Sequence, residues 1–428
     1  MSLDFRNPDI GKYMLKGNFG LEKECLRVTP DGFLAHTEHP FINNPNIERD
    51  FCENQVELIT DVSDSIDEVF EELALLQKKV VKTLQNLETG KELLWPFSNP
   101  PYILGEQDIP IANYKGTHIG KELYREYLAQ KYGKKKMLFS GIHFNFSFSK
   151  ELMEKGYRES NLPSLKEYKN KIYLELAKKV TKYSWLIVYL TAASPVMDGS
   201  FFHDEDKGKV VLKNLASPRC SKIGYWNDFV PLLDYDTMQS YIRSIEAYVE
   251  QGQLKEAMEL YYPVRLKPTG ENSLENLKKS GVNHIELRML DLNPLESVGI
   301  GKTDLNFLHL FIVYLMFLKD EEFSHLEQTM AIKNEKRAAK YEEQSIWIET
   351  GWNTTLLVRQ AALDVLDSME HFFESFGKME FLEVICFQRE KILYPQKRYA
   401  VQVKEKFQED YVKQGVMLAE KYAYELGQ

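Results

Sequence analysis

The sequence has little cysteine and no paired cysteine motif. Its 428 residues contain Cys25, Cys52, Cys220 and Cys386, and no two of them form a Cys-x-x-Cys pair. Secreted proteins that depend on disulfides carry cysteines at close, regular spacings, and this chain does not. We therefore expect free thiols and a reducing, cytoplasmic location.

Long apolar runs and an excess of basic charge are also missing. The most apolar stretch, residues 185–196, is about half as long as a membrane-spanning helix. No basic segment followed by an apolar one opens the chain, so no secretion signal is expected. The 54 Lys and Arg residues are outnumbered by 64 Asp and Glu, which gives a net charge of −10. Because nucleic-acid binding needs a basic face, we expect neither a nucleic-acid partner nor a membrane.

The common nucleotide and zinc motifs are absent as well. The chain has no Gly-x-Gly-x-x-Gly, which gives a Rossmann site no support. Gly301-Lys302-Thr303 looks like the end of a phosphate-binding P-loop, but position 296 holds Glu296 where that motif needs glycine. His36 and His39 lack the spacing of the His-Glu-x-x-His zinc proteases.

Apolar periodicity predicts an α+β protein. Strand-like alternation is concentrated in the first 150 residues and returns near 285. Helical spacing is predicted over 63–87 with Ser63 or Ser65 as the N-cap, near 119–132, for about two dozen residues from 165, over 236–250, from about 303 onward, and over 402–426. No regular strand–helix alternation occurs, which favours a mostly antiparallel sheet. With no repeat or linker, we expect one unit over 1–428, with 1–301 carrying the motifs and 302–428 mainly helical.

The first predicted strand carries two acids on one side. Glu22 and Glu24 are two residues apart, so on a strand their side chains point the same way. Two carboxylates held together repel each other unless a cation lies between them. Hard oxygen ligands of this kind suit Mg²⁺ or Mn²⁺. By itself, such a pair is more often plain exposed charge.

Three further strands repeat this pattern of one apolar and one polar side. Their polar sides carry Glu53, Gln55 and Glu57 with Asp50 just upstream, then His143 and Asn145, then Glu286 and Arg288. Each group alone has an ordinary explanation, such as an exposed acid, a hydrogen-bonded core histidine or a surface charge pair. Together they have the composition of a site for two or three divalent cations and an anionic ligand.

Eight stretches in order resemble the bacterial glutamate–cysteine ligases, which join glutamate to cysteine in the first step of glutathione synthesis. They are Gly-Leu-Glu-Lys-Glu-Cys-Leu-Arg-Val at 20–28, Asp50-Phe51 through Glu57-Leu58-Ile59-Thr60, Trp95-Pro96 with Ser98 and Pro100, Leu123-Tyr124-Arg125-Glu126, Ser140-Gly141-Ile142-His143-Phe144-Asn145-Phe146-Ser147, Ala216-Ser217 through Arg219 to Gly224-Tyr225, Leu260-Tyr261 through Arg265, and Ile285-Glu286-Leu287-Arg288 with Leu290-Asp291 and Asn293-Pro294. The resemblance fades past 305. Some members carry a fused ATP-grasp domain, for which we expect no room in this chain.

The resemblance implies a glutamine-synthetase-like fold, in which an antiparallel sheet forms a concave active-site face and helices pack behind it and follow at the C-terminal end. It implies two or three Mg²⁺ or Mn²⁺ ions held by Glu22, Glu24, Asp50, Glu57, His143 and Glu286. Arg288 matches a phosphate-facing arginine and is expected to be catalytic together with Glu24 and Glu57. Arg219 matches a contact to a substrate carboxylate. Tyr124, Tyr225 and Tyr261 match the surroundings of the cysteine pocket, and Asn145 is also expected to contact substrate.

The implied reaction joins L-glutamate to L-cysteine with ATP as co-substrate, through a γ-glutamyl phosphate. Three alternatives remain open from the sequence. One is a carboxylate–amine ligase that joins glutamate to a different amine. Another is a non-catalytic relative that binds nucleotide or glutamate. The third is a metal-dependent hydrolase, which would need no ATP. The sequence does not indicate the oligomeric state.

Overall fold

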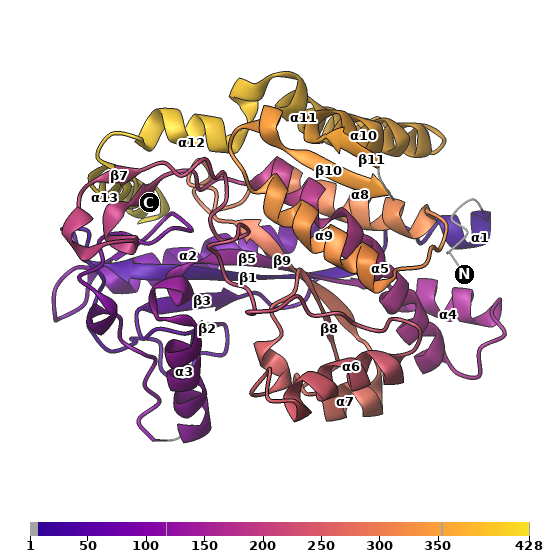
Figure 1. Ribbon diagram of the computed structural model, residues 1–428, viewed down its shortest axis with the longest axis horizontal. Coiled ribbons are helices and arrows are strands. Elements are labelled where there is room, and N and C mark those ends of the chain that lie inside the picture. Colours follow the sequence, from indigo (N-terminus) through magenta and orange to yellow (C-terminus); the bar gives the residue numbers. More distant parts are fainter. Residues whose placement is uncertain (1–6, 117, 352–353, 428) are drawn as a thin grey trace.

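A large antiparallel sheet runs through the middle of the molecule (Figure 1). The computed structural model describes residues 7–116, 118–351 and 354–427. Within these ranges, seven strands form the main sheet. They are β1 (Gly17–Val28), β2 (Ile47–Arg49), β3 (Gln55–Ile59), β4 (Leu93–Leu94), β5 (Gly141–Phe148), β8 (Val264–Lys267) and β9 (His284–Asp291).

The order of the strands places the longest one near the centre. The sheet runs β2-β3-β1-β5-β9-β8, and β4 pairs with the end of β1. Every pairing among these strands is antiparallel. Two short hairpins lie outside the sheet, β6 (Met197–Asp198) with β7 (Val210–Val211) and β10 (Trp347–Gly351) with β11 (Thr354–Leu357).

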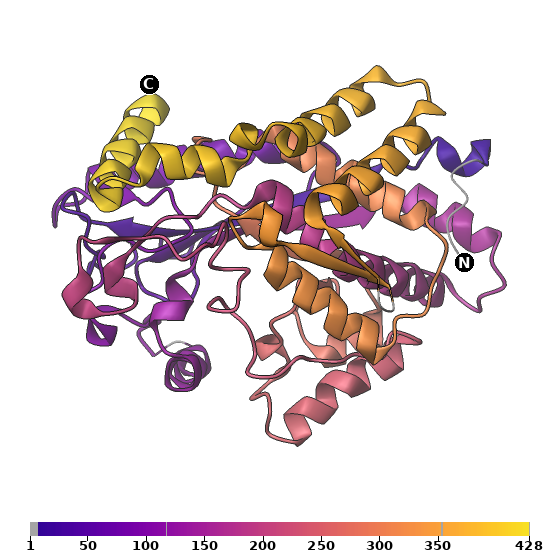
Figure 2. The same cartoon turned by 45° about the horizontal axis from the view of Figure 1, so that its top comes forward.

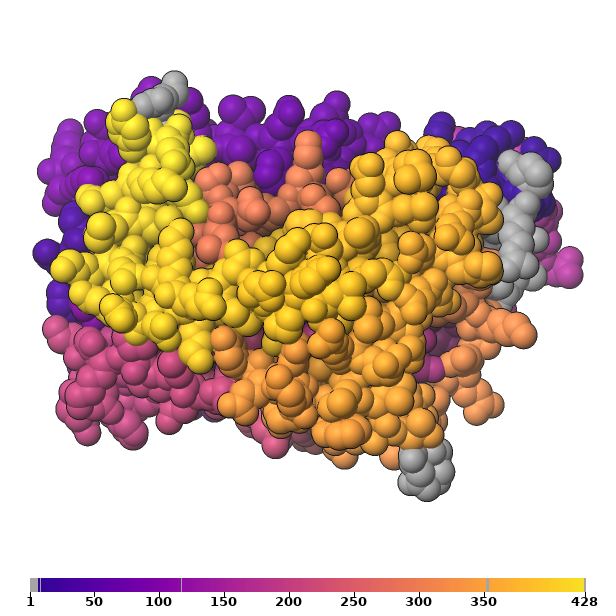
Figure 3. Space-filling view, turned by 90° about the horizontal axis from the view of Figure 1, so that it is seen from above, coloured from indigo at the N-terminus to yellow at the C-terminus, as the bar shows by residue number. Residues whose placement is uncertain are grey.

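Helices surround the sheet. They are α1 (Pro8–Gly11), α2 (Ile66–Gln85), α3 (Ile119–Tyr132), α4 (Lys150–Arg158), α5 (Leu165–Thr191), α6 (Met238–Glu250), α7 (Leu274–Ser280), α8 (Lys302–Phe317), α9 (His325–Ala338), α10 (Val358–Glu374), α11 (Met379–Leu393), α12 (Tyr399–Phe407) and α13 (Tyr411–Gly427). Figures 1 and 2 show α6 and α7 on the opposite side of the sheet from α10 to α13. In the space-filling view, the segment from α10 to α13 spreads across the middle of one face (Figure 3).

One face of the sheet forms the core, and this leaves the other face for chemistry. Phe144 and Phe146 on β5 are fully buried, as are Leu21 on β1 and Leu287 on β9. Helices α2 and α5 contact the sheet, and α8 packs against both of them. Because side chains alternate along a strand, the residues between these apolar ones must point to the opposite face. In the described ranges, no helix combines the length and apolar character that crossing a membrane requires.

The structure confirms the α+β class, the antiparallel sheet and most of the predicted helices. Ser65 caps α2 by accepting a hydrogen bond from the backbone of Glu68, and Gly133 ends α3. The interior helix α5 runs for 27 residues and starts after Ser164, whose side chain accepts a hydrogen bond from the Glu167 backbone. These caps satisfy amide groups that the first turn of a helix leaves unpaired.

The prediction of one helix over 402–426 is wrong. The helix is interrupted between α12 and α13, where Asp410 adopts a φ of 56°. The break lets the rings of Phe407 and Tyr411 meet Phe97 edge-on, at centroid distances of 5.0 and 4.9 Å. Burial of these rings outweighs the local preference of a charged, amphipathic segment for one straight helix. The hairpin β10–β11 was also not predicted, because it lies in a region where helical spacing dominates.

We predict that a buried ion pair anchors the C-terminal helices. Lys391 on α11 lies 2.7 Å from Asp304 on α8, with each side chain 3% exposed. Removing one partner leaves the other charge buried and unpaired. Lys391→Met should therefore lower the free energy of unfolding by about 3–5 kcal/mol, as measured by urea denaturation. The control is Lys302→Met, because Lys302 pairs with Asp67 on the exposed surface. It should change stability by less than about 1 kcal/mol. Equal effects of the two variants would contradict the prediction.

Candidate active site

The strand register brings the polar side chains of four strands together. Across β1 and β3, Glu24 is paired with Glu57, and across β1 and β5, Glu22 is paired with His143. Asn145 on β5 is paired with Glu286 on β9. Residues paired across antiparallel strands point to the same face. The acids that the sequence placed on separate strands therefore converge on the face opposite the core.

His143 is the centre of this cluster. Its Nδ1 lies 3.1 Å from Glu22 Oε2 and 3.5 Å from Glu286 Oε1, and its Nε2 lies 3.5 Å from Glu24 Oε1. The side chain of Asn145 donates a hydrogen bond of 3.0 Å to Glu22 Oε1. The imidazole is 3% exposed, so the contacts form away from bulk water. Three carboxylates therefore lie within reach of one buried ring.

Two carboxyl groups of the site, those of Glu57 and Glu24, resist ionisation. Burial raises the pKa of Glu57 well above its usual value, and the neighbouring Glu22, Asp50 and Glu24 raise it further. Burial also raises the pKa of Glu24, although His143 partly opposes this. A raised pKa means that the protein around these acids supplies too little positive charge to hold them ionised. Additional cationic charge is the missing element on this side of the cluster.

Glu286 behaves in the opposite way because protein cations surround it. Burial opposes its ionisation, but Arg288, Lys267 and Arg265 outweigh that effect and hold its pKa well below the usual value. Arg288 Nη1 lies 3.0 Å from Glu286 Oε2, and Lys267 Nζ lies 3.3 Å from Glu286 Oε1. The site thus has an acidic side on β1 and β3 and a basic side on β8 and β9.

A divalent cation fits the acidic side. Ligand atoms of Glu22, Glu57 and His143 all lie within 4.8 Å of one another. Oδ1 of Asn145 is buried and accepts no hydrogen bond, and the buried carboxylate oxygens of Glu286 are held by ion pairs with Arg288 and Lys267. Carboxylate and imidazole donors without a full set of partners suit Mg²⁺ or Mn²⁺. These residues could therefore hold metal without rearrangement of the strands.

Asp50 lies close enough to the cluster to act on its charges. It follows β2, and its charge acts on Glu24, Glu57 and Tyr225. Its carbonyl oxygen accepts a hydrogen bond of 2.6 Å from Nε of Arg125 on α3. Asp50 therefore connects α3 to the site.

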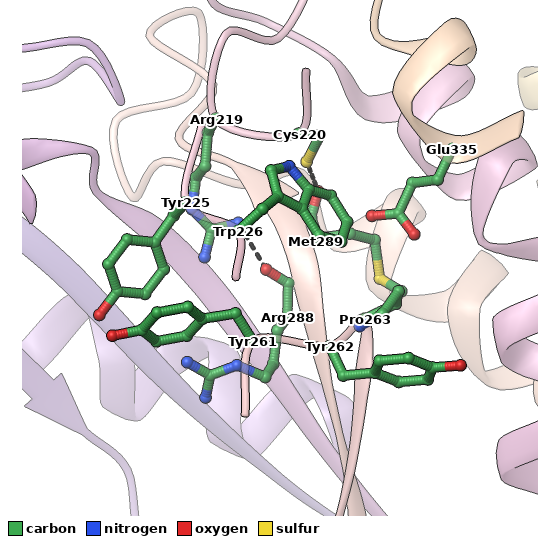
Figure 4. Close-up of a pocket in the computed structure, with 10 residues that line it drawn as sticks. All are labelled: Arg219, Cys220, Tyr225, Trp226, Tyr261, Tyr262, Pro263, Arg288, Met289 and Glu335. Atoms are coloured by element: carbon green, nitrogen blue, oxygen red, sulfur yellow. Dashed lines mark hydrogen bonds between the residues drawn. The ribbon is translucent and has the colours of Figure 1, made fainter. Parts of the chain in front are cut away.

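An arginine and three tyrosines line the space beside the basic side. The guanidinium of Arg219 donates to the carbonyl oxygens of Arg288 and Leu290, and its Nη2 lies 3.4 Å from His143 Nε2. The rings of Tyr225 and Tyr261 lie next to each other (Figure 4), with their centroids 4.0 Å apart. The third tyrosine, Tyr124 on α3, packs into the same apolar cluster as these two rings.

The structure thus brings together the residues predicted for metal, catalysis and substrate. One alignment was wrong. Glu53 precedes β3, and its carboxylate accepts hydrogen bonds of 2.8 Å from the backbone amides of His39 and Asn113, so it supports loops and does not join the cluster. Sequence reasoning gave no role to Arg265 and Lys267, although their spacing on one strand could have placed both beside Glu286. It had no signal for Glu335, which reaches a neighbouring cavity from helix α9.

Gly141 leaves room for the guanidinium of Arg219. A methyl group at Gly141 would lie 2.4 Å from Arg219 Cζ, closer than real contacts allow. Arg219 is held by backbone carbonyls, so Gly141→Ala should displace its guanidinium and raise the KM for an amino-acid substrate about 10-fold, the effect of roughly 1.4 kcal/mol. Steady-state kinetics would measure this. The control is Gly120→Ala on α3, where nothing lies within 4 Å of an added methyl. An unchanged KM in Gly141→Ala would count against Arg219 as a substrate contact.

Comparisons with known proteins show what this chain is similar to. The family model described as glutamate–cysteine ligase matches residues 4–255 and 250–338. The match therefore extends past residue 301, where the motifs in the sequence end. The bifunctional glutathione biosynthesis protein GshAB of Listeria welshimeri is 41% identical over 414 residues, which are 93% of this chain and 53% of that protein. The GshAB of Clostridium perfringens is 35% identical over 97% of this chain and 55% of that protein. The chain spans about half the length of the curated relatives it matches.

Two solved structures share the fold. A bifunctional glutathione synthetase from Pasteurella multocida has a TM-score of 0.83 and 29% identity, over 99% of this chain and 54% of that one. A glutamate–cysteine ligase from Francisella tularensis, solved in complex with AMP, has a TM-score of 0.84 and 25% identity, over 96% of this chain and 89% of that one.

Proposed function

The chain belongs to the glutamate–cysteine ligase family, and we propose that it joins L-glutamate to L-cysteine with ATP as the energy source. The product is γ-glutamylcysteine, and the reaction is the first step of glutathione biosynthesis. One observation carries the proposal: carboxylates from separate strands meet around His143, directly beside a cluster of basic side chains. A site with these two sides suits a reaction in which one anion must approach another.

The chemistry explains why both sides are needed. A carboxylate does not acylate an amine in water because oxide is a poor leaving group. In the proposed route, the γ-carboxylate of glutamate attacks the γ-phosphorus of ATP and gives a γ-glutamyl phosphate and ADP. The amine of cysteine then attacks the acyl carbon and expels phosphate. No covalent bond to the protein forms, so the site needs charge and geometry rather than a nucleophile.

The residues divide this work between them. The proposed ligands of two or three Mg²⁺ or Mn²⁺ ions are Glu22, Glu24, Asp50, Glu57, His143 and Glu286. When bound, such ions neutralise phosphate oxygens and align the two reactants. Arg288 supplies a fixed positive charge beside them for the transferring phosphoryl group. Its guanidinium is held in place by Glu286, so it need not reorganise during the reaction.

The space near Arg219 is the proposed site for the amino acids. Its guanidinium can pair with a substrate carboxylate, since its present partners include neutral backbone carbonyls. Tyr124, Tyr225 and Tyr261 would enclose the acceptor cysteine and keep water away from the acyl phosphate. Asn145, with an unpartnered Oδ1, is the proposed contact for a substrate ammonium group.

The finer description of the fold is also part of the proposal. We propose a glutamine-synthetase-like arrangement in which the polar sheet face is the active-site face. We further propose that residues 1–428 act as one catalytic unit. The main apolar core supports this, because it includes residues from Ile10 to Ala423. The free thiols in the described chain agree with a reducing compartment such as the cytoplasm.

The decisive experiment measures ADP release with glutamate, cysteine and MgATP, and omits each component in turn. The proposal expects ADP release with all three, loss of the signal without ATP or metal, and formation of γ-glutamylcysteine by mass spectrometry. A faster reaction with a different amine would assign the ligase to that acceptor. Absence of ADP release with every amine tested would point to a non-catalytic relative that only binds ligands.

A further inference from the structure

A small cavity continues from the tyrosine pair toward helix α9. Its wall comes from the loop before α6, the segment at 261–263, strand β9 and α9 (Figure 4). The lining residues are Arg219, Cys220, Tyr225, Trp226, Tyr261, Tyr262, Pro263, Arg288, Met289 and Glu335. The volume of the cavity that water-sized groups can occupy is about 40 Å³. That space suits a small chemical group or a few waters, and not a whole amino acid.

Glu335 is the unexpected member of this lining. It is 1% exposed, and its Oε2 is buried without a hydrogen-bond partner. Figure 4 shows its carboxyl group directed toward Met289 and Pro263, on the far side of Trp226 from the tyrosine pair. Buried oxygens without partners are rare because each one loses its hydration without compensation. An oxygen of this kind in a cavity wall is ready to accept a hydrogen bond from a ligand.

The rest of the wall determines what kind of ligand group can enter. Arg219 and Arg288 line the same cavity, so an ammonium group would meet two positive charges. A carboxylate would meet Glu335, where burial already raises the pKa of the acid to about 7. An uncharged donor avoids both penalties. Met289 places a thioether in the wall, and the thiol of Cys220 is already used in a hydrogen bond to the Met289 carbonyl. Sulfur and aromatic walls favour a polarisable, weakly hydrated group.

A thiol meets all of these conditions. It is neutral, small and polarisable, and its S–H is a weak donor. A hydroxyl group is also a donor, but it loses more hydration on entering an apolar wall. A methyl group would fit the space but would leave Oε2 of Glu335 unpaired.

We propose that Glu335 is a specificity-determining residue that accepts a hydrogen bond from the thiol of the acceptor amino acid. This inference rests on the proposed function, because it assigns the side chain of the acceptor to the Glu335 end of the cavity. The carboxylate of the acceptor would stay at the Arg288 and Arg219 end, where its amine would react in the uncharged form. Glu335 would thereby help the enzyme to distinguish cysteine from 2-aminobutyrate, which carries a methyl group in place of the thiol.

The expected size of this preference is modest. A single small group in an apolar pocket changes kcat/KM by about 10- to 200-fold. Because S–H is a weak donor, we expect the wild-type enzyme to prefer cysteine over 2-aminobutyrate by about 10-fold, near the lower end of that range. 2-Aminobutyrate should therefore still be used as a slow substrate.

The test compares kcat/KM for cysteine and for 2-aminobutyrate in wild type and in variants, at about pH 8, where Glu335 is mostly ionised. Glu335→Met removes the acceptor oxygen but keeps an unbranched side chain. It should bring the ratio close to one, through a higher KM for cysteine and an unchanged kcat/KM for 2-aminobutyrate. Glu335→Gln keeps a carbonyl acceptor and should retain most of the preference. Lys333→Met, on the exposed side of the same helix, is the matched control and should behave as wild type.

Each outcome decides the matter. If Glu335→Met lowers the rates with both amines equally, Glu335 has only a structural role and the inference is overturned. The same holds if the ratio stays at the wild-type value. Should Glu335→Met fail to fold, Glu335→Asp withdraws the carboxylate by one methylene and should still lower the preference for cysteine at least about 3-fold. If the wild-type enzyme releases no ADP with either amine, the proposed function itself is overturned, and the inference about Glu335 falls with it.

Discussion

Glu24→Gln and Glu57→Gln are each expected to abolish ATP-dependent ligation while leaving the fold intact. Each change removes one negative charge from the acidic side of the site and keeps the shape of the side chain. A divalent cation held by fewer carboxylates binds more weakly and neutralises the reacting anions less well. We expect kcat/KM to fall by at least about 1,000-fold, which corresponds to roughly 4 kcal/mol of lost transition-state stabilisation.

Glu57→Gln is expected to abolish activity without lowering the stability of the metal-free protein. Burial and neighbouring acids raise the pKa of Glu57 well above its unfolded value. A group of this kind contributes most to stability while it is protonated, and that contribution is lost as the pH rises through its folded pKa. In metal-free protein above neutral pH, Glu57→Gln should therefore unfold at the same or a higher temperature than wild type. Loss of activity together with retained stability would separate a role in the site from a role in the fold.

Two measurements complete this test. Isothermal titration of Mg²⁺ should show weaker binding to Glu57→Gln than to wild type. Glu71→Gln, an exposed acid on α2, should change neither activity nor metal affinity. Near-normal rates in Glu24→Gln or Glu57→Gln at saturating Mg²⁺ would show that the metal assignment is wrong.

Alternation along the strands explains why so much of this site could be predicted from the sequence. On β5 the polar residues His143, Asn145 and Ser147 alternate with apolar ones, and on β1 Glu22 and Glu24 are two residues apart. The period of two fixes each of these sets to one face, whatever the neighbouring strands are. The apolar partners, such as Phe144 and Phe146, are buried as expected. What alternation cannot give is the register, which decides that Glu24 stands opposite Glu57 and Glu22 opposite His143. The resemblance to a known family supplied that step.

The errors have local physical causes. Glu53 was aligned with Glu57, but a turn closes just before β3, where the amide of Gln55 donates to the carbonyl of Cys52. The alternation therefore begins only at Gln55, and Glu53 points elsewhere. The break at Asp410 could not be predicted from helical periodicity, because aromatic residues distant in sequence determine it.

The place of Glu335 in the site could also not be predicted from the sequence. It lies on α9 among charged residues, where one more glutamate is unremarkable in the sequence. Only the packing of α9 against α5 and the loop at 219–226 makes it a buried cavity residue. Long-range packing of this kind leaves no periodic signal in a single chain.

Arg288→Ala is expected to impair phosphoryl transfer far more than substrate binding. Arg288 Nη1 lies 3.0 Å from Glu286 Oε2, so the guanidinium has a fixed position between the proposed metal ligands and the substrate space. A preorganised charge acts mainly where negative charge develops in the transition state, and less on the bound ground state. We expect kcat to fall about 100- to 1,000-fold and KM for ATP and glutamate to change by less than about 5-fold.

The neighbouring contacts make this substitution a clean one. Arg219 bonds to the backbone carbonyl of Arg288 and not to its side chain, so the alanine variant keeps that contact. Lys267 and Arg265 still neutralise Glu286. Arg288→Lys keeps the charge but loses the planar fork, and it should recover only part of kcat. Rapid-quench measurement of the first turnover would locate the defect in the phosphoryl-transfer step. A rise in KM with unchanged kcat would instead place Arg288 in ground-state binding, because a charge that acts equally on substrate and transition state cannot accelerate their interconversion.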